Sequence, residues 1–342
     1  MEDESRLIAP DAVPADIGFD LSLRPKTLSE FIGQPRLKEN LSVFLEAARH
    51  RDEPCEHVLL YGPPGLGKTT LAHVIAKEMN ANVKVTSGPA LDKVGDLAAI
   101  LTNLEDGDVL FIDEIHRMNH NIEEVLYPAM EDFALDLMIG KGPTARALRL
   151  DLKRFTLVGA TTKMSLLSAP LRDRFGAIYH LDFYGIDEMT AIVQRTAQLL
   201  NIPIDPEPAQ HIASRSRRTP RVGNRLVKRV RDFAQVRGNG ILTPSTVDQA
   251  LTALEIDPRG LDETDRRTLR TIIEKFSGGP AGLTTIAASM NEEVSTLEDV
   301  IEPFLLQEGL LNRTPRGRMA TDEAYAHLNI PLPQLRQQES LL

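Results

Sequence analysis

Short apolar runs alternate with segments of helical periodicity over the first half of the chain. Strands are expected at 57–62, 83–88, 108–116 and 155–162, and helical spacing of apolar residues is clear at 41–50 and 69–80. Apolar strands separated by helices are typical of a parallel sheet that is covered on both faces. The pattern therefore predicts an α/β domain built on a parallel sheet.

A different pattern interrupts this alternation at 136–155. Apolar and polar residues alternate on both sides of 141–145, which predicts a β-hairpin. Its apolar side chains could form a docking surface, or they could pack within the hairpin itself; they are Leu137, Met138, Ile139 and Leu148.

Strand signals stop after Tyr184. Residues 187–255 have helical periodicity, and 256–260 are expected to form a linker. Amphipathic segments follow at 268–276, 283–290 and 295–309, and a turn at 312–321 lies between two short strands. Three helices and a hairpin are the pattern of a winged helix. We expect a tail at 1–22, an α/β domain at 23–184, a small helical domain at 185–256 and a winged helix at 257–342.

Composition narrows the function classes. The 342 residues include 39 Lys and Arg against 49 Asp and Glu, a net charge of −10, so the protein is not expected to coat duplex DNA by charge alone. One cysteine, Cys55, excludes an internal disulfide and a zinc site made of cysteines. The acidic N-terminus is unlike a signal peptide, and no apolar run is long enough to span a bilayer. We expect a cytoplasmic protein that does not act at a membrane.

The first candidate site is a glycine-rich loop between an expected strand and an expected helix. Residues Gly62–Thr69 read GPPGLGKT and match G-x-x-x-x-G-K-[ST]. Glycines let the backbone N–H groups of such a loop face phosphate oxygens, while its lysine reaches the outer phosphates and its hydroxyl binds Mg²⁺. ATP and Mg²⁺ are the expected ligands, and the candidate contacts in this loop are Gly65, Gly67, Lys68, Thr69 and Thr70.

A pair of carboxylates supplies the second half of this chemistry. Asp113 is expected at the end of an apolar strand, where it can hold Mg²⁺ through water, and Glu114 can polarise the attacking water. Asp113 lies 45 residues beyond Lys68, which is enough for a helix, a strand and a helix between two strands of one sheet. We interpret the nearby His116 as a polar residue at a helix start.

Several segments in one order resemble the RuvB family of AAA+ ATPases, the motors of bacterial Holliday-junction branch migration. The resemblance runs from about Leu23 to Leu328, and the segments are GPPGLGKTTLA, VLFIDEIHRM, YPAMEDF, MIGKGP, LVGATT, APLRDRFG, RTPRVGNRL and RTPRGRMAT. The phosphate loop and carboxylates alone would fit many NTPases. The hairpin, the arginine segment and the last turn make the resemblance specific.

The resemblance implies further residues around the nucleotide. Arg174 resembles an arginine finger that reaches the ATP of a neighbouring subunit, Thr162 resembles sensor 1 and Arg221 resembles sensor 2. The other implied contacts are Leu23, Arg24 and Tyr184 at the base, and Glu131, Asp132 and Phe133 near the nucleotide at the subunit boundary.

Each of these has a simpler interpretation. Arg174 could form a surface ion pair with Asp173, and Tyr184 could be a core aromatic residue. Arg221 lies in the basic stretch 215–231, and a charged helix face is usually solvated.

The turn at 312–321 is the candidate DNA contact. Arg313, Arg316 and Arg318 surround a proline and a glycine, and guanidinium groups on a turn can contact DNA phosphates. The expected third helix, 295–309, contains four acids and no lysine or arginine, so little base reading is expected. The resemblance singles out Arg313 and Arg318.

Three positions depart from the family pattern. Lys163 stands where arginine is frequent, Arg218 where glycine is frequent, and Val294 where a nearby arginine is expected. The last departure leaves more of the DNA contact to the turn.

These inferences together predict an ATP-hydrolysing motor that moves the duplex arms of a four-way junction. The resemblance implies a hexameric ring, loaded on DNA by a RuvA-like junction-binding protein that docks on the hairpin 136–155, and it allows for a RuvC-like resolvase as a further partner. The alternatives are another AAA+ DNA machine, such as a clamp-loader subunit, and an ATP-gated DNA-binding switch.

Overall fold

The computed structural model describes residues 23–139 and 146–333. The chain forms two compact units, one ending at Glu188 and the other beginning at Met189. The expected N-terminal tail, 1–22, lies outside the described residues. Among the residues that the structure describes, no helix is both long and apolar enough to cross a membrane.

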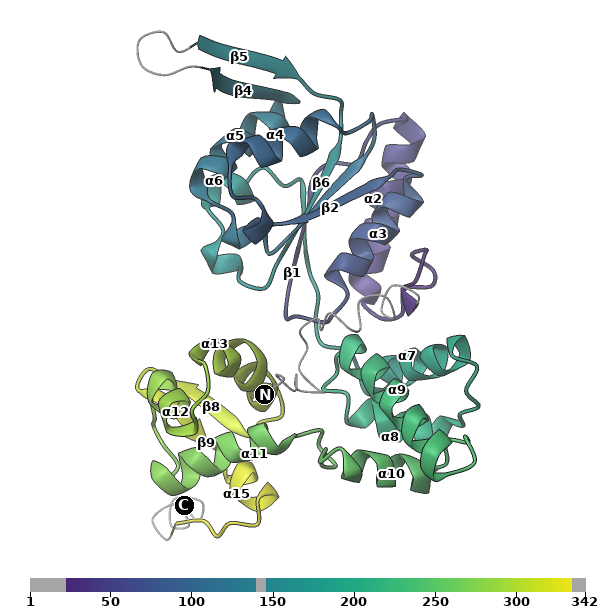
Figure 1. The fold of residues 1–342 in the computed structure, drawn as a ribbon, viewed down its shortest axis with the longest axis vertical. Helices are drawn as coiled ribbons and strands as arrows, with labels where there is room; N and C mark the ends of the chain where they lie inside the picture. The colour runs from purple at the N-terminus through teal and green to yellow at the C-terminus, as the bar shows by residue number, and fades with distance from the viewer. Residues whose placement is uncertain (1–22, 140–145, 334–342) are drawn as a thin grey trace. The chain divides into compact units, whose positions relative to one another are not determined.

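A five-stranded sheet organises the first unit (Figure 1). Its strands, in the order β2-β3-β6-β1-β7, are β2 (Val83–Ser87), β3 (Val109–Asp113), β6 (Thr156–Thr161), β1 (Val58–Tyr61) and β7 (Ala177–His180). All neighbouring strands are parallel, so the carboxyl ends of all five strands lie at one edge of the sheet and their amino ends at the other.

The sequence predicted four of these strands and missed β7. The residues of the missed strand alternate between half-buried and exposed, and Ile178 remains 43% exposed. An edge strand of four residues with this pattern lacks the apolar run that marks the buried strands.

Helices cover both faces of the sheet. They are α2 (Pro35–Arg51), α3 (Lys68–Glu78), α4 (Val94–Thr102), α5 (His120–Glu131) and the single turn α6 (Ala169–Arg172). Leucines of α4 and α5, such as Leu97 and Leu126, pack on strand residues Leu110 and Leu157, and all four are fully buried. The predicted α/β class with a parallel sheet is confirmed.

The predicted hairpin is confirmed as the antiparallel pair β4 (Ala134–Ile139) and β5 (Arg146–Asp151) (Figure 1). Ala134 pairs with Asp151 at its base, where Leu135 joins the core. Leu148 is 40% exposed. The side chains of Leu137, Met138 and Ile139 lie outside the described residues, so the choice between docking and packing stays open for them.

The second unit contains the predicted helical segment and the predicted winged helix. The helical segment comprises α7 (Ile186–Leu199), which begins in the first unit, followed by α8 (Pro206–Ser214), α9 (Pro220–Arg237) and α10 (Pro244–Ala253). The winged helix begins with α11 (Glu263–Arg270), which continues as a π-helical turn to Lys275, and α12 (Leu283–Met290). A helical segment then runs from α13 (Val294–Thr296) through α14 (Glu302–Gln307), and strands β8 (Leu311–Thr314) and β9 (Gly317–Ala320) follow it. The last helix, α15 (Asp322–His327), was not predicted from the sequence.

The expected linker is an ordered part of this unit. Ile256 is buried, and the Asp257 carboxylate accepts hydrogen bonds from the backbone N–H groups of Arg259 and Leu261. His327 of α15 also contacts this carboxylate, at 2.8 Å. These bonds attach 256–260 to the winged helix.

The segment between α8 and α9 has a left-handed backbone at two residues. Arg217 has φ of 52° and Arg218 has φ of 50°. Left-handed conformation costs a residue with a Cβ about 1–2 kcal/mol, and glycine avoids this cost. Arg218 therefore introduces backbone strain that glycine would avoid.

We expect Arg218→Gly to stabilise the second unit by about 1 kcal/mol relative to Arg218→Ala, because both remove the side chain and only glycine relieves the strain. In a unit of this size, that corresponds to about 2–4 °C in the midpoint of thermal unfolding, measured by calorimetry. Equal midpoints for the two variants would show that the backbone at this position is not strained.

Candidate functional site

The glycine-rich loop connects β1 to α3 at the carboxyl edge of the sheet. Gly62 has φ of 144°, and a Cβ there would lie 2.5 Å from the carbonyl oxygen of Leu181. Gly67, which precedes α3, has φ of 104°. Side chains at these positions would strain or displace the loop, so the motif's glycines are required by the local backbone.

The structure brings the predicted phosphate and metal ligands together. The Lys68 ammonium donates to the carbonyl oxygens of Gly62 and Pro63 at 2.7 and 2.8 Å, within the loop. The hydroxyl of Thr69 lies 3.4 Å from a carboxylate oxygen of Asp113 at the end of β3. A hydroxyl and a carboxylate are hard oxygen donors, the kind that Mg²⁺ prefers.

Glu114 follows Asp113 in a left-handed conformation with φ of 47°. Its carboxylate accepts a hydrogen bond from Arg117 at 3.1 Å and is partly exposed, so it can face solvent at the carboxyl edge. His116 lies in a short 3₁₀ turn, Ile115–Arg117, in agreement with its interpretation as a polar residue at a helix start. In addition, its Nδ1 lies 2.9 Å from the hydroxyl of Thr161.

The strand that was expected to end at Thr162 ends one residue earlier. Thr161 is buried, while Thr162 is exposed just beyond the carboxyl end of β6. Gly62 donates a backbone hydrogen bond to the Thr161 carbonyl at 3.2 Å, so the glycine-rich loop and the end of β6 are neighbours. The sensor 1 candidate therefore lies at the same edge as Lys68 and Asp113.

Tyr184 braces the glycine-rich loop. Its side chain is 2% exposed, and its hydroxyl donates to the carbonyl oxygen of Leu66 at 3.1 Å. Burial, together with the nearby Glu188 carboxylate, raises the pKa of the phenol. These observations support the core interpretation of Tyr184.

The other residues implied at the base lie close to this region. Leu23 is buried. Burial, together with the positive charge of Arg24, lowers the pKa of His73 on α3, the helix that follows the loop. Leu23 and Arg24 are therefore ordered beside the nucleotide-binding half of the unit.

Arg174 lies at the opposite, amino edge of the sheet. It precedes β7, and with Glu56, His57 and Met130 it lines a cavity at the amino end of β1. Its Nε is 3.2 Å from the Glu131 carboxylate, and it donates to the carbonyl oxygen of Pro170 at 2.6 Å. Arg172, rather than Arg174, approaches Asp173, at 3.9 Å. The length of β1, about 13 Å at ~3.3 Å per residue, separates Arg174 from the loop of its own chain.

Tyr127 supports Arg174, and the sequence did not single it out. The guanidinium carbon of Arg174 is 4.3 Å from the centre of the Tyr127 ring, a cation–π contact. The Tyr127 hydroxyl donates to the buried Glu123 carboxylate at 3.1 Å, and Ser168 donates to the same carboxylate at 2.8 Å. The available signals were the spacing of Glu123 and Tyr127 by four residues on a helix and the place of Tyr127 at the start of the segment YPAMEDF.

The rest of the 131–133 segment also lies at the amino edge. Asp132 accepts from Arg149 of the hairpin at 2.9 Å, and the Phe133 ring packs edge-on against Phe155. His57 joins this edge to α5, because one ring nitrogen accepts from the Leu157 N–H and the other lies 3.0 Å from the Met130 carbonyl oxygen. Burial lowers the pKa of His57, which keeps the ring neutral.

Arg221 belongs to the second unit, where it occupies the first turn of α9. Its helix begins at Pro220, which fixes the helical φ at the first position.

The wing, defined as residues 311–320, presents its three arginines unequally. Arg318 makes two hydrogen bonds to the buried Glu302 carboxylate, at 3.1 and 2.8 Å, and its side chain is 13% exposed. Arg313 is 3.7 Å from the same carboxylate but 61% exposed. Arg316 is exposed at the turn and makes no hydrogen bond or ion pair with the described residues. Arg313 and Arg316 are thus the more accessible cations.

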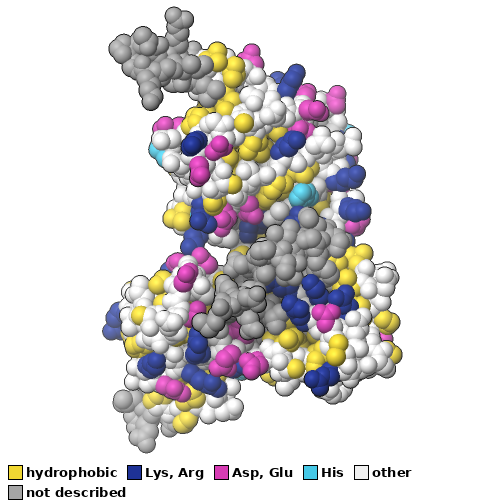
Figure 2. Space-filling view, in the orientation of Figure 1, with side chains coloured by type: hydrophobic (Ala, Val, Ile, Leu, Met, Phe, Trp, Pro, Cys, Tyr) yellow, Lys and Arg dark blue, Asp and Glu magenta, His cyan; other side chains and the backbone are white. Residues whose placement is uncertain are grey.

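Charge is interspersed over the face that Figure 2 shows. In each unit, lysine and arginine side chains lie there among acidic ones. With a net charge of −10, DNA contact is therefore expected to be local.

Three family models match consecutive parts of the chain. Residues 23–181 match the Holliday junction DNA helicase RuvB P-loop domain, residues 184–257 match the RuvB AAA lid domain, and residues 258–329 match the RuvB C-terminal winged helix domain.

Whole-chain relatives agree with these matches. The chain is 59% identical over 330 residues to the Holliday junction branch migration complex subunit RuvB of Dehalococcoides mccartyi, covering 96% of this chain and 95% of the relative. It is 60% identical over 329 residues to the protein of that name from Chloroflexus aurantiacus, covering 96% and 94%. A solved structure, the Thermotoga maritima RuvB Holliday junction branch migration motor, is 54% identical with a TM-score of 0.84, covering 91% of this chain and 100% of that one.

Tyr184→Phe is expected to lower ADP affinity about three- to tenfold, because the Leu66 carbonyl loses its hydrogen bond and the loop loses its brace. Isothermal titration calorimetry measures the effect. Tyr179→Phe is the matched control, because Tyr179 lies on β7, where it pairs with Leu60 within the sheet. If ADP affinity is unchanged in Tyr184→Phe, the hydroxyl does not matter for binding. The aromatic ring would then be the part of Tyr184 that acts, as expected for a contact with adenine.

Proposed function

The chain belongs to the RuvB family, and from this we propose that it is an ATP-hydrolysing motor that drives branch migration of Holliday junctions. It acts in recombination and DNA repair, in the cytoplasm, where its DNA substrate lies. The single observation that best supports this function is the position of Arg174 at the sheet edge opposite the nucleotide loop. An arginine so placed serves the nucleotide of a neighbouring copy, which requires an assembly.

Nucleotide chemistry is divided among the residues of the carboxyl edge. Lys68 would hold the outer phosphates, and Thr69, together with Asp113 acting through water, would hold Mg²⁺, which supplies positive charge against the phosphates when it is bound. Glu114 accepts a proton from the attacking water, for which its carboxylate must leave Arg117. Thr162 at the end of β6 completes this edge as sensor 1. The oxygen donors at 3.4 Å from one another support the metal assignment.

The neighbouring copy supplies the arginine finger. Arg174 neutralises charge on the transferred phosphoryl group, and Glu131 and Tyr127 orient it until it engages. Arg221, in the first turn of α9, acts as sensor 2. The copies form a hexameric ring around duplex DNA, which is the closed arrangement that a head-to-tail interface generates.

DNA and protein partners bind at two hairpins. The wing contacts phosphates through Arg313 and Arg316, while Arg318 supports the wing through Glu302. The hairpin β4–β5, with its exposed Leu148, receives a RuvA-like junction-binding protein that loads the ring, and a RuvC-like resolvase acts on the same junction.

The direct test of the function is migration of a synthetic four-way junction in the presence of ATP, Mg²⁺ and the junction-binding partner. Labelled arms should exchange only when ATP is hydrolysed. Stoichiometric binding without arm exchange would favour an ATP-gated switch instead.

Lys68→Ala should lose most ATP binding, because a phosphate charge partner is removed. Glu114→Gln should keep ATP binding and lose hydrolysis, since only the proton acceptor changes. Equilibrium binding and phosphate release measure the two quantities separately. Equal loss of binding in both variants would exclude Glu114 as the base.

Arg174→Ala should bind ATP nearly normally and hydrolyse it slowly, because the guanidinium acts as charge develops on the phosphoryl group. Mixing it with Lys68→Ala should restore part of the turnover, since some interfaces then pair an intact loop with an intact arginine. Mixed rings that stay at the baseline of the single variants would contradict action across the interface.

Arg313→Ala combined with Arg316→Ala should flatten the salt dependence of DNA binding by about two, one for each phosphate that an arginine no longer neutralises. Arg318→Lys is the control, since it keeps the wing's positive charge and alters only the bond to Glu302. Binding measured between 50 and 200 mM salt, about the range in which such interactions dominate, gives the slope. A slope unchanged in the double variant would move the DNA contact away from the wing.

A further inference from the structure

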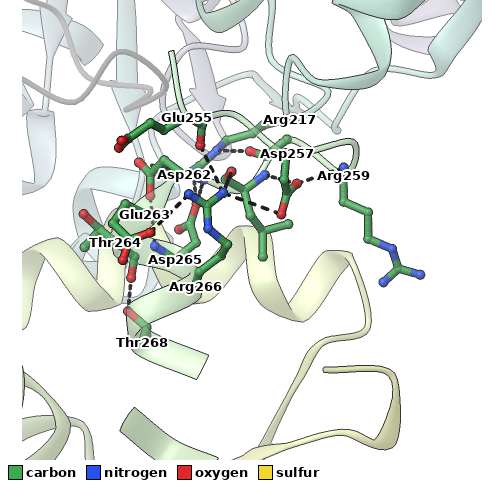
Figure 3. Close-up of polar contacts among 12 residues, drawn as sticks. Arg217, Glu255, Asp257, Arg259, Asp262, Glu263, Thr264, Asp265, Arg266 and Thr268 are labelled. Atoms are coloured by element: carbon green, nitrogen blue, oxygen red, sulfur yellow. Dashed lines mark hydrogen bonds and ion pairs between the residues drawn. The ribbon is translucent and has the colours of Figure 1, made fainter. Parts of the chain in front are cut away.

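One arginine joins two parts of the second unit that the family matches treat as separate domains. We call residues 189–255 the lid and residues 261–329 the head. Arg217 lies in the lid, between α8 and α9, and its side chain is almost fully buried among head residues. Figure 3 shows Arg217 among polar residues of the connecting segment 255–260 and of the start of the head, including Asp262 and Asp265.

The polar contacts of Arg217 fix both the position and the orientation of its guanidinium. One nitrogen donates to the Asp265 carboxylate and lies 3.7 Å from Asp262, and its Nε donates to the Gly260 carbonyl oxygen at 3.3 Å. Asp265 is fully buried, and it forms a reciprocal capping box with Asp262 at the start of α11. The guanidinium is thus bonded to the group that defines where α11 begins.

A second contact connects Arg217 to the helix behind the wing. Its guanidinium carbon is 4.4 Å from the centre of the Phe304 ring on α14. Two residues earlier on this helix, Glu302 holds Arg318 of the wing through two hydrogen bonds. Arg217 of the lid and Arg318 of the wing therefore contact side chains of the same short helix, α14.

The backbone of Arg217 is continuous with the sensor 2 candidate. The Thr219 hydroxyl donates to the Arg217 carbonyl oxygen at 2.9 Å, and the Thr219 N–H donates to the Ser216 carbonyl oxygen at 3.0 Å. Pro220 and Arg221 follow in the first turn of α9. The segment between Arg217 and Arg221 is therefore short and held by its own hydrogen bonds.

We propose that Arg217 is a positioning residue for DNA translocation, which holds the head at one orientation on the lid so that movement of the lid moves the wing. A buried ion pair adds little net stability compared with apolar residues of the same size, but its directional bonds select one geometry. The proposal rests on the proposed motor function only where it concerns translocation.

The geometric part is tested by distance measurements in the full chain. Spin labels at Val236→Cys on α9 and Ala288→Cys on α12, in a Cys55→Ser background, report the lid–head distance by pulsed electron resonance. Both positions are exposed. We expect a single narrow distribution for the parent chain and at least a twofold broader one for Arg217→Gln.

Arg215→Gln is the matched control. Arg215 lies two residues away and is also largely buried, but it pairs with Asp248 inside the lid at 3.1 Å. It should leave the distribution narrow. Asp265→Asn is a second test variant, because the amide oxygen can still cap α11 while the charge opposite Arg217 is lost; it should broaden the distribution even where Arg217→Gln does not fold.

The functional part is tested by the base pairs migrated per ATP hydrolysed. This ratio should fall at least tenfold in Arg217→Gln or Asp265→Asn, while ATP hydrolysis without DNA stays within twofold and Arg215→Gln leaves both unchanged. Narrow, unshifted distances together with a normal ratio would overturn the proposal. A parent chain that migrates no junction would refute the proposed function, while the distances would still decide the role of Arg217.

Discussion

The direction of five parallel strands is the constraint on which the site depends. Because all five strands run the same way, the loop after β1 and Asp113 after β3 meet at the carboxyl edge. Arg174 precedes β7 and therefore lies at the amino edge, held by Glu131 and Tyr127. One chain cannot bring these groups to the same phosphate without rebuilding its sheet. The fold therefore keeps Arg174 away from the loop of its own chain, as the proposed division of the site between neighbouring copies requires.

Buried carboxylates fix the orientation of functional side chains at three points in the chain. Glu123 anchors Tyr127 beneath Arg174, Glu302 anchors Arg318 in the wing, and Asp265 anchors Arg217 between lid and head. Each carboxylate is nearly or fully buried, so removing its partner would leave an uncompensated charge. Such pairs contribute geometric specificity more than net stability.

The sequence predicted what depends on neighbouring residues in the chain. The glycine-rich loop, Asp113 at a strand end, the hairpin and the wing each have a local signature, and all were predicted from it. The edge strand β7 was not predicted, because its four residues alternate between half-buried and exposed and so form no apolar run.

Long-range pairs could not be predicted in the same way. Arg318 bonds to a glutamate sixteen residues away and Arg217 to an aspartate forty-eight residues away, and no local pattern marks either pair. The three wing arginines look equivalent in the sequence, and only the position of Glu302 distinguishes Arg318 from Arg316. Tyr127 and Tyr184 likewise acquire their roles from tertiary contacts with Arg174 and Leu66.

The most direct test of a divided site is the ATP hydrolysis rate per subunit as the protein is diluted, with the assembly state followed in parallel by light scattering. If Arg174 completes the site of a neighbour, the rate per subunit should fall toward zero as the protein dissociates to single chains, at saturating ATP and Mg²⁺. A rate per subunit that stays constant down to the fully dissociated chain would contradict the account, because each chain would then contain a complete site.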